Sequence, residues 1–269
     1  MCYVIQSFGR SSEPLLKTVD SAFILTMHDS QRTKSAGGKD LLTLCGQTYL
    51  QINHGWKRCT KPDHVASTAT DLIDAYRHLF TTVEHLDQPI LILEDDAVIF
   101  RREREHYEKV DEFVRSKQFD VYSLGSVGAL HPFQLALHRR YIGFSGFSQA
   151  IIWSAEGRRN MLRMMDSLDA RRTIHMDMHL ISKLNLRYTY HKPLVVQLFP
   201  DTENQRAWCY RCKNEWWEVM VTASWVKVLN AMGLSERPNG WSTLYCVNRH
   251  CLRVLIALLT ILLVTRRAR

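Results

Sequence analysis

The chain has 269 residues, of which 46% are hydrophobic and 23% are charged, and these ordinary values argue against long disordered regions. Its length suits one large α/β domain or two small ones. A formal net charge of +8 is compatible with an anionic ligand, a membrane surface or nucleic acid. Nucleic acid is the weakest choice, because no run of Lys and Arg interleaved with aromatic residues dominates the sequence.

The amino-terminal residues 1–18 are polar and mixed, and they predict a short tail or a loosely packed arm. They contain no basic segment followed by an apolar stretch, as a secretory signal would require. Together with seven cysteines, an odd number, this pattern predicts reduced thiols and a cytoplasmic location. Cys209 and Cys212 form a lone Cys-x-x-Cys pair, which we interpret as two plain thiols rather than a zinc site.

Three regular elements are predicted in the first third of the chain. Residues 22–27 (AFILTM) indicate a strand followed by a polar loop, and residues 48–52 indicate a second strand. A turn at 53–55 precedes a helix at 70–84, whose apolar residues form a stripe along one side. Thr70 is the predicted N-cap of this helix.

The most informative stretch is LILEDDAVIF, residues 91–100. The apolar run 90–93 predicts a strand buried on both faces, which ends abruptly at Glu94, Asp95 and Asp96. Three adjacent carboxylates repel one another and are costly to desolvate, so they need a partner. Mg²⁺ or Mn²⁺, which also binds substrate phosphates, is the favoured partner, and ligands of open α/β sheets bind at such strand ends. A solvated boundary between strand and turn is the alternative.

The middle of the chain predicts two further pairs of a helix and a strand. Residues 103–117 indicate a helix, and residues 119–124 indicate a strand that ends at Gly125. A glycine at the carboxyl end of a strand lets a ligand approach the backbone closely. Residues 146–154 predict another strand, which leads into a helix at 155–168.

The carboxyl-terminal part divides into two predicted segments. Residues 201–243 predict a helical extension packed on the domain, and residues 244–269 predict a hydrophobic and basic tail. The apolar run 254–265 would form a helix of about 18 Å, which is too short for a hydrocarbon core of roughly 30 Å. Its arginine-rich flanks suit anionic lipid headgroups, so a membrane-associating tail is favoured over a buried terminal helix.

The stretch LILEDDAVIF resembles the acidic signature of family 25 glycosyltransferases, an apolar strand followed by Glu-Asp-Asp-Ala and soon a Phe. The resemblance runs from about residue 22 to residue 197 and then fades. It implies a catalytic domain at 19–200 with a GT-A fold, an α/β mixed sheet flanked by helices that binds a nucleotide sugar. Members of this family act on acceptors as different as bacterial lipopolysaccharide and collagen hydroxylysine.

The resemblance also implies which residues form the site. Mn²⁺ or Mg²⁺ would be bound by Glu94, Asp95 and Asp96, and the UDP- or GDP-sugar donor by Thr26, Arg32, Asp95 and Gly125. The alternative for Arg32 is a solvent-exposed arginine in a loop. The chain departs from the family after the first strand, where it has Thr-Met-His in place of an Asn-Leu-Asp-Arg-like sequence.

A second acidic residue, Asp177, follows from the same resemblance. Family members carry an Asp ahead of a short strand and a Pro-containing segment that ends in Gln, and this chain has Asp177, then 188–190 and 193–197. The resemblance implies that Asp177 deprotonates the acceptor hydroxyl in an inverting transfer. The alternative is an acid at a helix N-terminus that balances the dipole. A zinc site with His175 and His179 is disfavoured, because a helix would point Asp177 away from the two histidines.

The favoured function is therefore a metal-dependent glycosyltransferase, a hexosyltransferase, acting on a glycan, lipid-linked or protein acceptor at a cytoplasmic membrane surface. One alternative is a metal-dependent phosphohydrolase or nucleotidyltransferase, which would need more carboxylates or histidines on neighbouring strands. The other is a catalytically inactive, membrane-tethered carbohydrate-binding or scaffold protein on the same fold.

Overall fold

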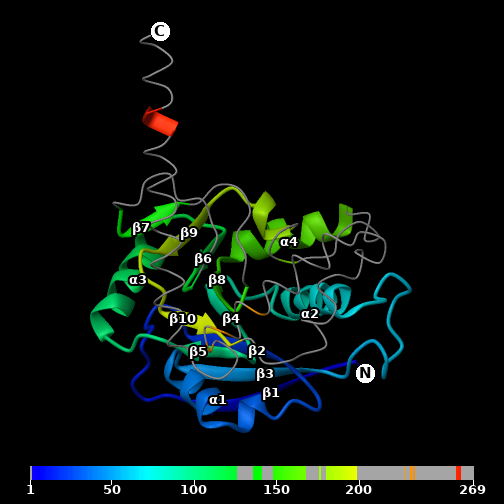
Figure 1. Cartoon of the computed structure of the whole chain (residues 1–269). Coiled ribbons are helices and arrows are strands. Elements are labelled where there is room, and N and C mark those ends of the chain that lie inside the picture. Colours follow the sequence, from blue (N-terminus) through cyan, green and yellow to red (C-terminus); the bar gives the residue numbers. More distant parts are fainter. Residues whose placement is uncertain are drawn as a thin grey trace.

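The computed structural model describes residues 2–125, 136–140, 148–167, 176, 180–198, 227, 231, 233 and 259–261. Within these residues, helices cover both faces of an eight-stranded mixed sheet (Figure 1). The α/β fold with a mixed sheet flanked by helices, predicted from the sequence, is confirmed.

The strands are short apart from the first three. Their bounds are β1 (Tyr3–Arg10), β2 (Ser21–Met27), β3 (Gln47–Asn53), β4 (Ile90–Glu94), β5 (Ala97–Ile99), β6 (Val121–Ser123), β7 (His138–Arg140), β8 (Ala150–Trp153), β9 (Arg187–Tyr190) and β10 (Val195–Gln197). The helices are α1 (Ala36–Asp40), α2 (Thr68–Thr82), α3 (Arg104–Ser116) and α4 (Ala155–Ser167), and the 3-10 turns are η1 (Arg32–Lys34), η2 (Leu41–Thr43) and η4 (Ile181–Lys183).

Five strands of the large sheet run in the same direction. The order is β1-β3-β2-β4-β8-β6-β9-β7, in which β3, β2 and β4 are parallel neighbours, and so are β6 and β9. β8 is antiparallel to both β4 and β6, which places all five parallel strands with their carboxyl ends at one edge. A small sheet of β5 and β10 follows the end of β4.

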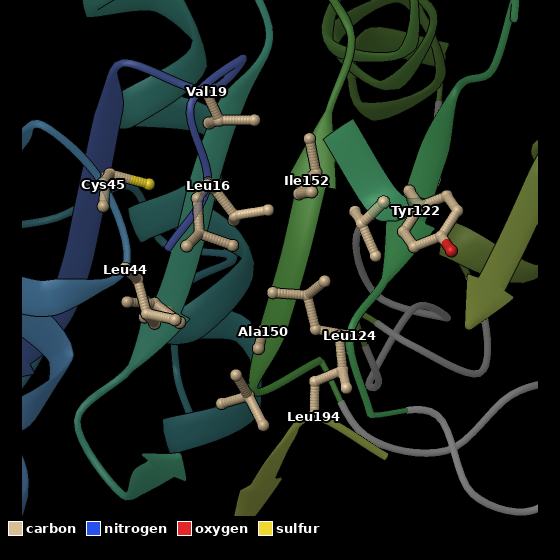
Figure 2. Packing of buried hydrophobic residues seen from close by; sticks show 14 of the residues in the cluster. Leu16, Val19, Leu44, Cys45, Tyr122, Leu124, Ala150, Ile152 and Leu194 are labelled. Carbon is tan, nitrogen blue, oxygen red and sulfur yellow. The ribbon is translucent and has the colours of Figure 1, made fainter. Parts of the chain in front are cut away.

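The core lies on both sides of the sheet. In β4, Leu91 and Leu93 belong to the cluster beneath α3, whereas Ile90 and Ile92 belong to the cluster beneath α2 and α4. Figure 2 shows part of the first cluster. All four side chains are at most 1% exposed, and burial of each contributes about 1.5–3 kcal/mol. The predicted strand buried on both faces is confirmed, and its apolar run anchors the acidic turn that follows.

The amino-terminal segment is an edge strand, so the prediction of a tail or loose arm is wrong. β1 pairs antiparallel with β3 from Tyr3 opposite Asn53 to Arg10 opposite Gln47. Beyond the strand, Leu16 is fully buried in the core. An edge strand exposes much of its surface and can therefore carry polar residues, so β1 lacks the regular apolar alternation that predicts a strand.

The long helix α2 starts slightly earlier than predicted. Ser67 is the N-cap, and its side chain accepts a hydrogen bond from the Thr70 backbone N–H, while the Thr70 side chain bonds back to the Ser67 backbone. Thr70 is therefore the third helical residue of a capping box rather than the cap.

Cys2 and Cys59 form a disulfide, so the prediction of reduced thiols is wrong for this pair. Cys45 is free and buried. Because disulfides persist mainly in oxidising compartments, the cysteine count no longer supports a cytoplasmic location.

Cys209, Cys212 and nearly all of the predicted extension (201–243) and tail (244–269) lie outside the described residues. No helix in the described part of the chain is long and apolar enough to cross a bilayer.

Candidate functional site

The acidic turn lies at the edge where the parallel strands end. β2 and β4 are neighbours with Leu25 opposite Glu94, so the residues that follow these two positions meet. Thr26 Oγ1 donates a hydrogen bond of 2.8 Å to Asp95 Oδ2. The backbone pairing therefore explains why a residue of the first predicted strand and a carboxylate of the acidic motif share one site, at the edge where open α/β sheets bind ligands.

Arg32, in η1, bridges the two aspartates. Its Nη1 donates to Asp95 Oδ1 at 2.9 Å and lies 3.8 Å from Asp96 Oδ2. The Arg32 side chain is 34% exposed, whereas those of Asp95 and Asp96 are 12% and 11% exposed. Because a guanidinium carries five N–H donors, Arg32 can hold both carboxylates in place and still bind a further anion from its exposed side.

Asp96 is the least satisfied carboxylate of this cluster. Its Oδ2 accepts a hydrogen bond of 2.9 Å from Gln197 Nε2, but its Oδ1 is buried without a hydrogen-bond partner in the described part of the chain. Burial, and then the charge of Asp95, raise the pKa of Asp96 from 3.8 to about 7. A buried carboxylate oxygen without a partner costs free energy, so the site favours a ligand that brings positive charge.

Glu94 forms hydrogen bonds to a different part of the chain. Its side chain accepts a hydrogen bond of 2.5 Å from Ser148 Oγ, and its backbone N–H donates to Gln149 O at 3.0 Å. Glu94 is thus bound to the segment that enters β8, whereas Asp95 and Asp96 are bound through Arg32 and Gln197. The structure brings two of the three predicted metal ligands together around one guanidinium.

Asp95 and Asp96 fit an oxygen-preferring cation, because Asp96 Oδ1 is a buried carboxylate oxygen to which no described residue donates a hydrogen bond. Among the described residues there is no group of three or more His, Cys, Asp and Glu side chains arranged to hold a metal. Mg²⁺ in nucleotide sites commonly takes one or two carboxylates and completes its shell with substrate phosphates and water. The aspartate pair matches that kind of site rather than a site made of protein groups alone.

Gly125 is required by packing inside the protein. A Cβ at this position would lie 1.7 Å from Val195 O and 2.9 Å from Gln149 Nε2. The Gly125 carbonyl accepts a hydrogen bond of 2.7 Å from Gln149 Nε2. The glycine was predicted because a ligand could approach it closely, but the backbone of β10 occupies that space. Gly125 therefore serves the site indirectly, by letting β10 pack against the end of β6.

Two residues of the site were not predicted. Gln197 reaches Asp96 because β10 pairs with β5, with Val196 opposite Val98. Ser148 binds Glu94 from the start of β8. Gln197 could have been predicted as a site residue, because it ends the Pro-containing segment that the family resemblance includes. No sequence pattern around Ser148 indicates a role in the site. Asp177, the predicted catalytic base, lies outside the described residues.

Comparisons with models of known protein families and with curated proteins gave no match to this chain.

Proposed function

We propose that this protein is a metal-dependent glycosyltransferase of GT-A type, which moves a sugar from a nucleotide-diphosphate donor to a hydroxyl acceptor. The observation that carries the proposal is the buried Asp96 Oδ1, which has no hydrogen-bond partner among residues such as 2–125 and 180–198 that the structure describes, beside Asp95 and Arg32. This arrangement combines two carboxylates for a cation with one guanidinium for an anion. A site that binds a divalent cation together with a diphosphate needs both the carboxylates and the guanidinium.

The position of the site supports the same proposal. Thr26 lies near the carboxyl end of β2, and Asp95 and the loop that carries Arg32 follow the parallel strands β4 and β2 at the same edge of the sheet. Nucleotides bind in open α/β folds at this edge, where the backbone turns away from the sheet and leaves room for a ligand. The resemblance of the acidic stretch to family 25 glycosyltransferases adds the expectation of a UDP- or GDP-sugar.

Asp95 and Asp96 would hold Mn²⁺ or Mg²⁺, with Glu94 supporting the turn through Ser148. When bound, the cation supplies electrostatic stabilisation of the leaving nucleoside diphosphate. Thr26 orients Asp95 by donating to its Oδ2, and Gln197 orients Asp96 by donating to its Oδ2.

Arg32 contributes in two ways to donor binding. Its ion pair with Asp95 fixes the guanidinium at the edge of the sheet. Its exposed N–H groups would donate to phosphate oxygens, for which the planar guanidinium is well suited. Because Arg32 also lowers the repulsion between the two aspartates, it keeps them close enough to share one cation.

Acceptor activation is proposed from the resemblance alone. Asp177 would take the proton of the acceptor hydroxyl as the oxygen attacks the anomeric carbon, which gives inversion. The acceptor would be a glycan, a lipid-linked glycan or a protein, and the carboxyl-terminal tail would hold the enzyme at a membrane surface. Nucleic acid is not part of the proposal.

The test is a panel of nucleotide sugars incubated with purified protein, with release of nucleoside diphosphate measured with and without Mn²⁺. We expect release from one donor that depends on Mn²⁺ and is lost in Asp96→Ala. Asp166→Asn is the matched control, since the Asp166 side chain is 68% exposed and its ion pair among the described residues is with Arg77. A rate unchanged in Asp96→Ala would remove the proposed metal role. No release and no thermal response to any donor would favour the inactive binding or scaffold protein.

A further inference from the structure

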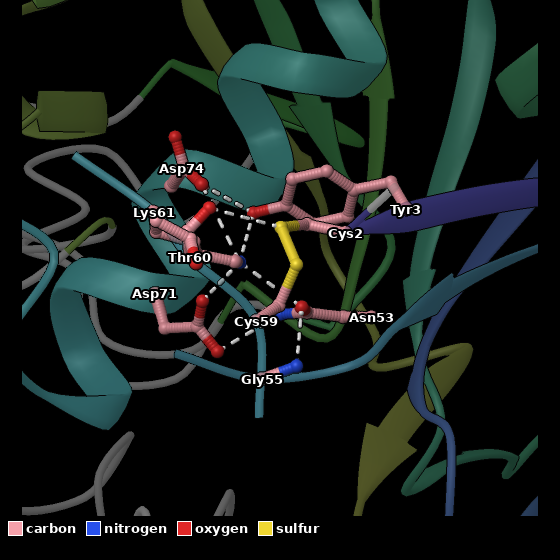
Figure 3. Close-up of a disulfide and its surroundings, with 9 residues drawn as sticks. All are labelled: Cys2, Tyr3, Asn53, Gly55, Cys59, Thr60, Lys61, Asp71 and Asp74. Carbon is pink, nitrogen blue, oxygen red and sulfur yellow. Dashed lines mark hydrogen bonds and ion pairs between the residues drawn. A yellow bond between two sulfur atoms is a disulfide. The ribbon is translucent and has the colours of Figure 1, made fainter. Parts of the chain in front are cut away.

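The Cys2–Cys59 disulfide joins the start of β1 to the segment 54–67 that connects β3 to α2 (Figure 3). Because β3 is parallel to β2 and β4, this segment leaves the sheet at the same edge as Thr26 and Asp95. Both cysteines are half-buried. A small reductant can therefore reach the disulfide, which lies at the functional edge of the protein.

A buried lysine packs beside this disulfide. The Lys61 side chain is 2% exposed, forms an ion pair with Asp71 and lies 3.4 Å from Asp74 Oδ2. Its Nζ lies 4.1 Å from the centroid of the Tyr3 ring and donates to the Tyr3 hydroxyl. Tyr3 follows Cys2 directly, so the disulfide holds the tyrosine on the lysine. A buried ammonium is costly unless it is paired, so the conformation of the segment depends on keeping these partners beside Lys61.

The segment also contacts the loop that follows β2. The His28 and His54 ring centroids lie 4.7 Å apart, directly beyond the end of the β2–β3 ladder, where the His28 N–H donates to Asn53 O at 2.9 Å. Arg58 Nη2 forms an ion pair of 3.0 Å with Asp29. An exposed ion pair is weak alone. The ring contact and the ion pair together attach the segment to the loop that follows β2.

We infer that the disulfide is a redox-sensitive tether that positions Arg32. In the oxidised protein, the segment beside Cys59 holds residues 28–29 in place, and these residues lead directly to Arg32 at Asp95. Reduction frees this segment and loosens the loop that bears Arg32. The inference deepens the proposed function and rests on it for the ligand, a nucleoside diphosphate. Affinity falls on reduction because the loop must then be ordered at the moment of binding.

The redox step is a thiol–disulfide exchange with a dithiol. One thiolate attacks a sulfur of the Cys2–Cys59 bond and forms a mixed disulfide, and the second thiol of the reductant then displaces the remaining protein sulfur. Two electrons and two protons pass to the protein. Cys2 and Cys59 become thiols, and the dithiol becomes its own disulfide.

The experiment measures the Kd of UDP and GDP in the presence of Mn²⁺ by calorimetry, with the full chain either oxidised or reduced by dithiothreitol that is then removed under argon. We expect binding about tenfold weaker after reduction, the size expected when a loop must be ordered on binding. The Cys2→Ser/Cys59→Ser double variant should bind weakly under both conditions and lose its response to dithiothreitol. This control separates the disulfide from the other cysteines.

Hydrogen exchange measured on the same samples needs no ligand. Amides of residues 28–32 should exchange faster after reduction, and Arg58→Ala should reproduce part of this change with the disulfide intact. Equal affinities in both redox states, with faster exchange confined to 2–10 and 54–67, would overturn the inference. If the oxidised protein binds neither nucleotide but exchange rises at 28–32, the tether stands and the proposed function fails.

Discussion

Replacement of Asp96 by Asn should stabilise the protein without metal at neutral and alkaline pH. Asn has nearly the same shape as Asp, and its carbonyl oxygen can accept the hydrogen bond that Gln197 now donates to Asp96 Oδ2. The substitution removes a charge whose burial, next to the charge of Asp95, raises the pKa of Asp96 to about 7. The proposed metal ligand Asp96 is thus expected to reduce the stability of the free protein.

The sign and the pH window follow from the two protonation states. Below pH 3.8, the ordinary pKa, Asp96 is protonated in both folded and unfolded protein and has no effect. Between pH 3.8 and about 7 the folded protein keeps a proton that the unfolded chain has lost, so stability falls as pH rises. Above pH 7 the full cost applies, about 4 kcal/mol at about 1.4 kcal/mol per pH unit.

The net gain from Asn is smaller, because its amide N–H group is buried in place of the unpartnered Oδ1 and costs about 1–2 kcal/mol. We therefore expect Asp96→Asn to raise the free energy of unfolding by about 2–3 kcal/mol at pH 8 and by about zero at pH 5. The corresponding rise in Tm at pH 8 is roughly 5–10 °C.

The assay is urea and thermal unfolding at pH 5 and pH 8 in a chelating buffer, with Asp166→Asn as the exposed control. The control should show no gain that depends on pH. Adding Mn²⁺ with UDP or GDP should stabilise the wild type and leave Asp96→Asn unchanged. A variant that is less stable than the wild type at pH 8, or equally stabilised at both pH values, would refute the assignment of Asp96 as a buried, unsatisfied acid.

Three further substitutions test separate parts of the site. Gly125→Ala should lower the free energy of unfolding in urea by more than about 3 kcal/mol, because the new Cβ would lie 1.7 Å from Val195 O. The control Gly46→Ala should have little effect in the same assay, because the nearest atom to its Cβ is 3.6 Å away. Gln197→Ala should weaken Mn²⁺ binding, measured by calorimetry, about five- to tenfold. Gln197→Asn should not restore binding, because the shorter side chain cannot reach Asp96. Arg32→Lys should raise the KM for the donor about tenfold in steady-state kinetics, with a smaller change in kcat, because Lys lacks the planar set of N–H donors that can bind two partners. An unchanged KM would contradict the role of Arg32 in phosphate binding.

The sequence predicted the centre of the fold because the relevant signals there are local. The apolar run before Glu94 and the abrupt change to three acids identified the buried strand and the point at which it ends. The amphipathic pattern of α2 gave the helix to within about two residues at each end. Such patterns depend on neighbouring residues, so they can be read without knowledge of the fold.

The parts that were missed depend on residues far apart in the chain. Gln197 and Asp96 are separated by 101 positions, and they meet only because β10 pairs with β5. Cys2 and Cys59 are separated by 57 positions, and the pairing of β1 with β3 brings them together. No local pattern encodes these partners, so neither the edge strand nor the disulfide followed from composition. The reason for Gly125 also depends on a distant strand.

The central claim is that the Asp95–Asp96 edge binds a divalent cation together with a nucleoside diphosphate. The most direct test is calorimetric titration of the oxidised protein with UDP and GDP, with and without Mn²⁺, in the wild type and in Asp96→Asn. We predict that one nucleotide binds, that its affinity rises at least tenfold with Mn²⁺, and that Asp96→Asn loses this rise while staying folded. Binding that is equally tight without Mn²⁺, or equally dependent on Mn²⁺ in Asp96→Asn, would contradict the claim.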